Sequence, residues 1–130
     1  MSRENRKVKR VILNDPLKVV MCSIGAQVKY ELTTRNVSYN GFFLEFDSPG
    51  RFPFTPSSIM EVWLELGEAN TIFFNGKMAR VVHAGDPMAK ELGTGIAIKI
   101  VQIERENEVS LKNFVNDKLL ELQEIDGTVA

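Results

Sequence analysis

The stretch Ile59-Met60-Glu61-Val62-Trp63-Leu64-Glu65-Leu66 decides the fold class, because apolar side chains recur in it at every second position. Met60, Val62, Leu64 and Leu66 form this apolar series. A period of two places such a series on one face of an extended strand, whereas a helix would need a period near 3.6. The segment is therefore expected to be a half-buried β-strand, with one face in a core and one face toward solvent.

Similar segments precede and follow this one, and turn-forming residues separate them. The expected strands cover residues 17–23, 26–34, 41–47, 59–66, 71–83 and 93–103. Glycine, proline, asparagine and aspartate punctuate the segments between them. Gly76 lies inside the fifth segment and predicts a bulge or a sharp bend. Short strands joined by turns favour a small antiparallel barrel, since closure removes the exposed edges of the sheet.

The end of the chain has a different period. Between residues 106 and 123, apolar residues fall within one arc of a helical wheel: Leu111, Phe114, Val115, Leu119 and Leu122. Gly127 follows, as glycine often does after a helix. The predicted fold class is therefore all-β, a six-stranded antiparallel β-barrel with a C-terminal α-helix. The expected organisation is a flexible basic tail over residues 1–12, the barrel over 13–104 and the helix over 105–125.

Composition excludes several classes of function. The chain has 130 residues, a net charge of −1 and 44% hydrophobic residues, which indicates one soluble domain without a general attraction for nucleic acid or acidic membranes. Cys22 is the only cysteine and His83 the only histidine, so neither a disulfide nor a zinc cluster is expected. No catalytic triad or phosphate-binding glycine-rich loop is visible, and we expect no enzyme and no metal.

The chain begins with a basic segment that is not followed by a long apolar one. Residues 1–10 carry five of the sixteen lysines and arginines. The apolar residues after them are interrupted by Asn14, Asp15, Pro16 and Lys18, so neither a signal peptide nor a spanning helix is expected. A cytoplasmic location without membrane insertion is the corresponding expectation. Trp63 and the phenylalanines are expected in the barrel core, although Phe42, Phe43, Phe52 and Phe54 are candidates for an exposed partner site.

Two motifs carry the candidate chemistry. The first is Arg6-Lys7-Val8-Lys9-Arg10, an Arg-x-x-x-Arg spacing at the end of the basic tail. The second is Asn36-Val37-Ser38-Tyr39-Asn40-Gly41, an Asn-x-Ser-x-x-Gly pattern expected in the turn between the second and third strands. Either motif alone is weak evidence, but both in this order around two strands are rarely accidental.

This pair of motifs resembles the defining pattern of PilZ domains, split β-barrels that bind the bacterial second messenger cyclic di-GMP. Strand order, length, the closing helix and the stretch Gly93-Thr94-Gly95-Ile96-Ala97-Ile98 are similar to the family as well. The resemblance implies that Arg6 and Arg10 contact guanine and phosphate, and that Asn36 accepts a hydrogen bond from a guanine N–H. Asn36 is the neutral variant at a position where the family has Asp or Asn, and an amide oxygen accepts less strongly than a carboxylate.

The chemistry of the residues agrees with this reading. An arginine fork can grip a phosphate or the O6/N7 edge of guanine, and it can stack on a purine. Ser38 offers its hydroxyl to a phosphate or to the loop backbone, and Gly41 permits a positive φ or a close approach. Arg35 is a candidate third cation, and Arg3 is a weaker one. The alternatives without a binding function are a solvated basic tail for the first motif and an ordinary Asx/Ser/Gly hairpin turn for the second.

The expected function is a cyclic di-GMP receptor whose N-terminal tail changes conformation on binding and signals to a protein partner. The family resemblance points to control of motility, attachment or exopolysaccharide. The first alternative is a PilZ-fold adaptor that binds proteins but not the nucleotide. The second is a nucleic-acid-binding barrel, which is disfavoured because the strands lack evenly spaced exposed aromatics with basic neighbours. Neither DNA nor RNA is an expected partner, and one or two messengers per chain both remain open.

Overall fold

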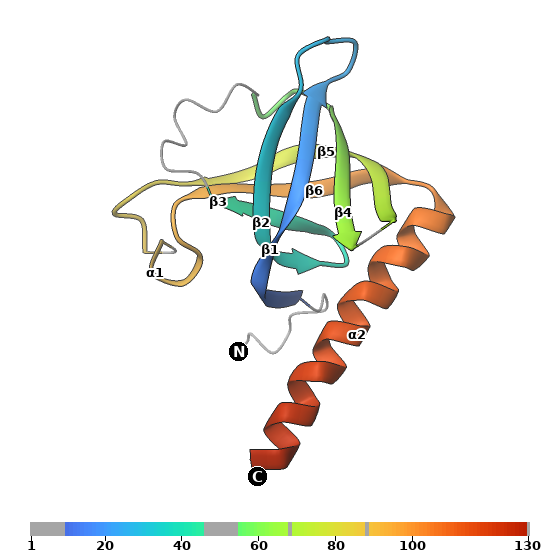
Figure 1. The fold of residues 1–130 in the computed structure, drawn as a ribbon. Coiled ribbons are helices and arrows are strands. Elements are labelled where there is room, and N and C mark those ends of the chain that lie inside the picture. Colours follow the sequence, from blue (N-terminus) through green and yellow to red (C-terminus); the bar gives the residue numbers. More distant parts are fainter. Residues whose placement is uncertain (1–9, 46–54, 68, 88, 130) are drawn as a thin grey trace.

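A computed structural model describes residues 10–45, 55–67, 69–87 and 89–129, and it is a closed six-stranded antiparallel barrel with a long C-terminal helix (Figure 1). The elements are β1 (Arg10–Ser23), β2 (Tyr30–Ser38), β3 (Gly41–Glu45), β4 (Met60–Gly67), β5 (Asn70–Val82), α1 (Ala89–Leu92), β6 (Gly95–Ile103) and α2 (Arg105–Val129). The predicted fold class is therefore confirmed. The four-residue helix α1 was not anticipated, because so short a segment has no readable period.

The strands do not follow one another around the barrel in chain order. Their spatial order is β1-β2-β3-β6-β5-β4, and β4 pairs with β1 to close the sheet. β3 therefore lies beside β6, and every neighbouring pair is antiparallel. Closure leaves the sheet without an edge strand, which agrees with the barrel predicted from six short strands joined by turns.

The interior of the barrel is built from the apolar series that the sequence displays. In β4, Met60, Val62 and Leu64 are buried, while Glu61 and Trp63 between them are only half-buried. The same alternation in the other strands completes one continuous core. Side chains that alternate in this way bury one face of each strand, which contributes about 1.5–3 kcal/mol for each large apolar side chain.

β1 begins earlier than the sequence predicted. Residues 10–12 belong to this strand and pair with β2, so the proposed boundary between a tail over 1–12 and a barrel from 13 is wrong for those three residues. The pairing register shifts between Ile12 and Leu17, which accommodates Asn14, Asp15 and Pro16 outside the regular ladder. The sequence predicted that the first strand begins only after these residues, but a bulge lets one strand continue through them.

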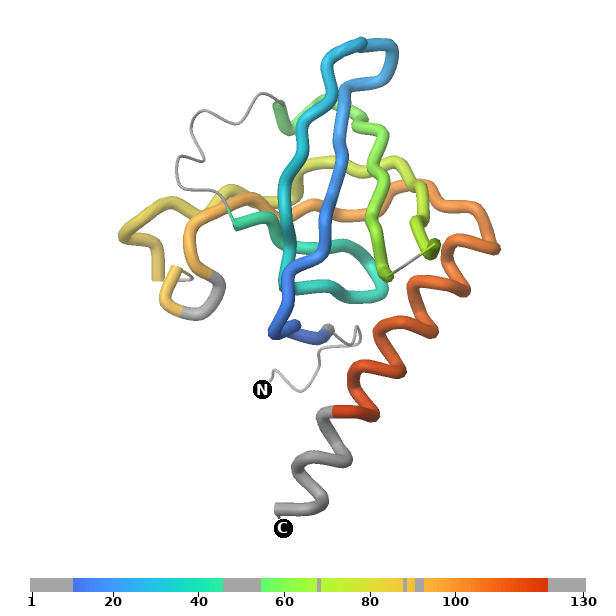
Figure 2. Tube along the Cα trace, viewed as in Figure 1, coloured from blue at the N-terminus to red at the C-terminus, as the bar shows by residue number. Residues whose placement is uncertain are grey.

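The other boundaries moved by smaller amounts. β2 starts at Tyr30 rather than residue 26, because the β1–β2 hairpin projects beyond the barrel (Figure 2). Val28, expected on a buried face, is 60% exposed in that projecting loop. The register of the β5–β6 pair shifts at Asn75/Gly76, which confirms the bulge predicted at Gly76. Phe52 and Phe54 lie outside the described residues.

Helix α2 packs the beginning of its apolar arc onto the barrel. Leu111 and Val115 belong to the same buried cluster as the interior strand residues, and Phe114 and Leu119 pack against it. The helix then continues away from the barrel (Figure 1). It runs to Val129, past both the expected end at residue 125 and Gly127.

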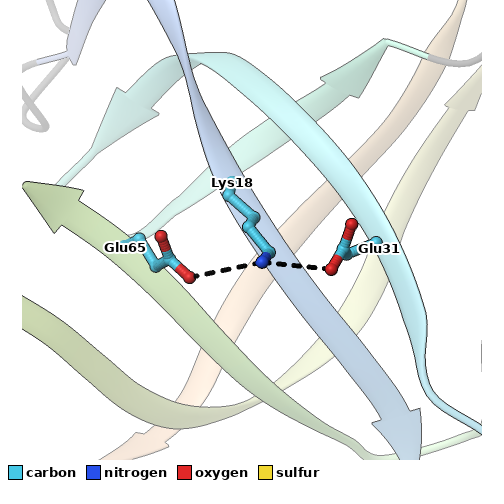
Figure 3. A network of polar contacts seen from close by, with 3 residues as sticks. All are labelled: Lys18, Glu31 and Glu65. Atoms are coloured by element: carbon cyan, nitrogen blue, oxygen red, sulfur yellow. Dashed lines mark ion pairs between the residues drawn. The ribbon is translucent and has the colours of Figure 1, made fainter.

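The outer wall of β1, β2 and β4 carries an ion-pair network. Lys18 lies between Glu31 and Glu65, with Nζ to oxygen distances of 3.1 and 3.8 Å (Figure 3). The hydrogen bond to Glu31 and then the two negative charges raise the pKa of Lys18 above its ordinary value. The three side chains are exposed, so solvent screens the network and its contribution to stability is small.

The prediction that Trp63 lies in the barrel core is wrong. It lies on the outer wall of β4, half-buried, with its ring centroid 5.1 Å from that of Phe73 on β5. Lys29 Nζ lies 4.7 Å from the Trp63 centroid, a cation–π distance. Phe42 and Phe43, considered as exposed candidates, are each only 5% exposed.

Candidate functional site

Two rows of residues cross the outer face of five neighbouring strands, β1, β2, β3, β6 and β5. Cross-strand pairing defines the serine row as Arg10, Ser38, Gly41, Lys99 and Lys77. It defines the asparagine row as Ile12, Asn36, Phe43, Ala97 and Arg80. The positions between the rows, including Val11, Val37 and Ile98, point into the core, so the other strand positions of the rows, such as Asn36 and Lys99, lie on the outside of the barrel. The rows bring together residues almost ninety positions apart in the sequence.

The first row joins the two sequence motifs. Arg10, the second arginine of Arg-x-x-x-Arg, is the register partner of Ser38 in Asn-x-Ser-x-x-Gly. Directly opposed residues of an antiparallel pair have Cβ atoms about 4.5–5.5 Å apart. The motifs therefore meet at one place on the barrel through backbone pairing. Arg6 lies outside the described residues.

A bulge in β2 aims two candidate residues outward. Thr34 pairs with Leu44 and Asn36 pairs with the preceding Phe43, which leaves Arg35 as the extra residue. Arg35 is exposed and Asn36 half-buried, one after the other on the solvent side. A regular strand would have turned one of these neighbours into the core, so the bulge places both at the site.

Thr34 holds this bulge from inside. It is the only buried polar or charged residue in the described part of the chain, with 0% exposure. Its hydroxyl donates to the carbonyl oxygen of Phe43 at 2.5 Å and accepts from the backbone N–H of Asn36 at 3.2 Å. The hydroxyl thus joins backbone groups on both sides of the bulge by hydrogen bonds. Sequence reasoning missed this role, because a threonine in a strand gives no sign of a bulge.

The serine and glycine of the motif shape the β2–β3 turn. Ser38 Oγ donates to the carbonyl oxygen of Gly41 at 3.3 Å and accepts from the Asn40 N–H at 3.2 Å. Of the two uses predicted for this hydroxyl, binding to the loop backbone is the one present here. Asn36 and Ser38 themselves end β2, so only the two residues before Gly41 form the turn that was expected over the whole motif.

Gly41 is required by a close approach of two strands. A Cβ at this position would overlap the carbonyl oxygen of Ile98 on β6. Its φ is not among the positive values of this backbone, so of the two alternatives considered for Gly41 the close approach is the one that is present. The close approach that glycine permits is to β6 rather than to a ligand. The 2.7 Å hydrogen bond from the Ile100 N–H to the Asn40 carbonyl oxygen fixes the same contact.

Two hollows flank the asparagine row and share Asn36 and Phe43 as walls. The first has a volume of about 190 Å³ and extends over Ser38 and Gly41 to Lys99. The second has a volume of about 310 Å³ and is bounded by Arg35, Glu45 and the bulged part of β1. Both are partly open to solvent, and together they offer amide, hydroxyl and cationic groups, with the carboxylate of Glu45 among the walls of the second. Such a surface suits a flat, polar, anionic ligand that lies along the barrel wall.

Three cations continue the two rows beyond β3: Lys99 lines the first hollow, and Lys77 and Arg80 follow on β5. Lys99, Lys77 and Arg80 come from β6 and β5, and sequence reasoning named none of them. Alternation around Ile96 and Ile98 places Lys99 outward in β6, but only the pairing of β3 with β6 brings it near Ser38. Among the described residues, neither Lys99 nor Lys77 forms an ion pair.

Other polar residues have structural positions. His83 is exposed, and its backbone N–H donates to Asp86 Oδ2 at 2.8 Å in the turn after β5. Cys22 is buried and its thiol donates to Glu61 Oε1 at 3.3 Å. The described residues contain no metal-binding group of histidine, cysteine, aspartate or glutamate. None of their helices is long and apolar enough to cross a membrane.

Known proteins share this sequence pattern and this barrel. Residues 4–117 match the PilZ domain family. The PilZ domain of YcgR from Escherichia coli, solved with c-di-GMP, superposes with a TM-score of 0.59 at 14% identity, covering 95% of this chain and 98% of that one. No curated protein matches the chain.

Two longer proteins have similar barrels. MotI/DgrA, an inhibitor of motility from Bacillus subtilis, gives a TM-score of 0.69 at 15% identity over 93% of this chain. PlzA from Borreliella burgdorferi, in complex with c-di-GMP, gives 0.53 at 15% identity over 86%. This chain spans 53% of the MotI/DgrA chain and 42% of the PlzA chain. At these identities the likeness concerns the fold alone.

Proposed function

The chain belongs to the PilZ domain family, and from this membership and the geometry of the two rows we propose that it is a receptor for cyclic di-GMP. The observation that carries the proposal is the register of Arg10 with Ser38, which pairs the backbone of one residue from each family motif. Structures of two similar barrels, from YcgR and PlzA, contain c-di-GMP. The proposal places the receptor in the cytoplasm and assigns it no catalytic step.

In this proposal the messenger lies along the asparagine and serine rows. Asn36 accepts from a guanine N–H, Arg10 contacts guanine or phosphate, and Arg6 reaches the same ligand from four residues earlier. Arg35 provides a cation on the second hollow. Ser38 and Gly41 support the site by shaping the turn and the strand contact beneath it, which agrees with their observed partners.

We further propose that binding is read by a protein partner through the N-terminal segment and α2. Tyr39, inside the second motif, donates a hydrogen bond from its hydroxyl to Asn116 Oδ1 on α2. Lys112 Nζ lies 5.8 Å from the same ring. A hollow of about 320 Å³ between β1 and α2 is lined by Leu13 and Phe114 among others. The second motif is thus hydrogen-bonded to α2 through Tyr39, and β1 borders the same helix across this hollow.

The position of Arg10 limits which residues can rearrange. Since Arg10 starts β1 and pairs with β2, a change of conformation on binding concerns the residues before it, including Arg6. Ordering such a segment over the ligand would alter the surface offered to a partner. Control of motility, attachment or exopolysaccharide is the downstream role that this reading favours.

Calorimetric titration with cyclic di-GMP, with GTP as the control nucleotide, tests the receptor and gives the number of messengers per chain. We expect saturable binding of cyclic di-GMP and none of GTP. Absence of heat and of thermal stabilisation at tens of micromolar ligand would favour the adaptor instead. Preferential binding of single-stranded oligonucleotides would favour the nucleic-acid alternative.

The assignment of the arginines has its own test. Replacing Arg6 or Arg10 by alanine removes a charge-assisted contact of about 1.5–3 kcal/mol, so affinity should fall at least about tenfold. Arg105→Ala removes an exposed arginine at the start of α2 and serves as the matched control. Unchanged affinity in both motif variants would remove the arginines from the site.

A further inference from the structure

Two lysines face each other directly across neighbouring strands on the outer wall. Lys77 of β5 is the register partner of Lys99 of β6, and both positions alternate with residues that pack in the core. Like charges in directly opposed positions of a sheet destabilise it. No described acidic side chain forms an ion pair with either of them. Among the described residues, therefore, no ion pair offsets the repulsion between the two lysines.

The usual structural reason for lysines on strands does not apply here. Lysines often protect the open edge of a sheet from pairing with another chain. β5 and β6 are both flanked by partners in a closed barrel, so neither offers an edge. An anionic ligand that binds on the outer wall of the barrel would explain the pair of lysines.

The lysine pair continues the serine row at its far end. From Ser38 the row passes over Gly41 to Lys99, a distance of two strand spacings or about 10 Å. Gly41 has no side chain, so nothing projects between Ser38 and Lys99, and both line the first hollow. Lys77 follows one spacing beyond. A ligand that contacts Asn36 and Ser38 can therefore extend directly to the ammonium group of Lys99.

We infer that Lys99 and Lys77 form an anion-binding site for a phosphate of cyclic di-GMP. Lys99 contacts the phosphate directly, and Lys77 strengthens the local positive potential. The inference rests on the proposed function and adds a contact outside both family motifs. A phosphodiester is negatively charged at any physiological pH, and it would relieve the repulsion between the two lysines when it binds. Arg10 and Lys99 then hold the ligand from opposite ends of one row.

The test combines ligand affinity with the stability of the free protein. Lys99→Gln should weaken cyclic di-GMP binding about tenfold and Lys77→Gln about threefold, and the affinity of both should depend less steeply on salt than the wild type. Without ligand, each variant should melt at the same temperature as the wild type or higher, since a repulsion has been removed. Lys99→Arg keeps the charge and should retain most of the affinity.

Lys90→Gln is the matched control, because it removes the same charge from an exposed site on α1. It should change neither affinity nor salt dependence. If the wild type binds cyclic di-GMP and Lys99→Gln binds it equally well with the same salt dependence, the anion-binding site is refuted. The proposed receptor function is not refuted by that result. If the wild type does not bind the messenger, the proposed function itself is refuted.

Discussion

Replacing Thr34 by valine tests the origin of the bulge that aims Arg35 and Asn36 outward. Valine has nearly the same shape as threonine, so the cavity term is negligible and the loss is that of the hydroxyl alone. The buried carbonyl of Phe43 and the N–H of Asn36 would then each lose the hydrogen bond to this hydroxyl. An unsatisfied buried polar group costs about 1–3 kcal/mol.

We expect Thr34→Val to lower the free energy of unfolding by about 2–3 kcal/mol, with the N–H contributing less because it is only partly buried. For a chain of this size that corresponds to a fall in melting temperature of roughly 8–12 °C. Thr34→Ser is the matched control. It keeps the hydroxyl and loses one methyl group, which costs about 1 kcal/mol.

The assay is urea unfolding followed by circular dichroism, with thermal melting as a second measure. The polar explanation predicts that the valine variant is less stable than the serine variant, whereas burial of apolar surface alone predicts the reverse order. A valine variant as stable as the serine variant would refute the reasoning. Equal m-values are needed for the comparison, because a change in m indicates a change in the compactness of either state.

Three further outcomes follow from the described contacts. Gly41→Ala should cost about 3 kcal/mol or more, because the new Cβ overlaps a backbone carbonyl of β6; Gly67→Ala, where nothing lies within 4 Å, should melt close to the wild type. Tyr39→Phe should raise the rate of amide hydrogen exchange in α2 around Asn116 while changing the melting temperature little, because the lost hydrogen bond is exposed. Unaltered exchange would show that the β2–β3 turn does not stabilise the helix. Burial, then the hydrogen bond to Glu61, raises the pKa of Cys22. The contribution of this thiol to the free energy of unfolding should therefore be fully present below its ordinary pKa and be lost as pH rises through the folded value, so the decline in stability over that range should be smaller in Cys22→Ala.

The strength of the receptor proposal lies in backbone pairing. Arg10 and Ser38 are register partners, and each belongs to a separate motif. A chance coincidence of sequence patterns would have no reason to place them opposite each other. In this proposal the neutral Asn36 accepts less strongly than a carboxylate would, so the cations of the serine row are expected to carry more of the affinity.

The sequence by itself determined the inside and outside of individual strands. Met60, Val62 and Leu64 were predicted on one face and are buried together, because a period of two depends only on the local geometry of an extended chain. The same holds for Leu111 and Val115 in α2, whose spacing reports a helix. The two motifs were also readable, since each is contiguous.

Only the tertiary structure decided which strands are neighbours. Lys99 and Ser38 lie sixty-one positions apart, and they meet because β3 pairs with β6 when the barrel closes. The bulge at Arg35 and the pairing of Lys77 with Lys99 have the same origin. Register between distant strands depends on how all six fit around one core, a balance of long-range packing that no local period records.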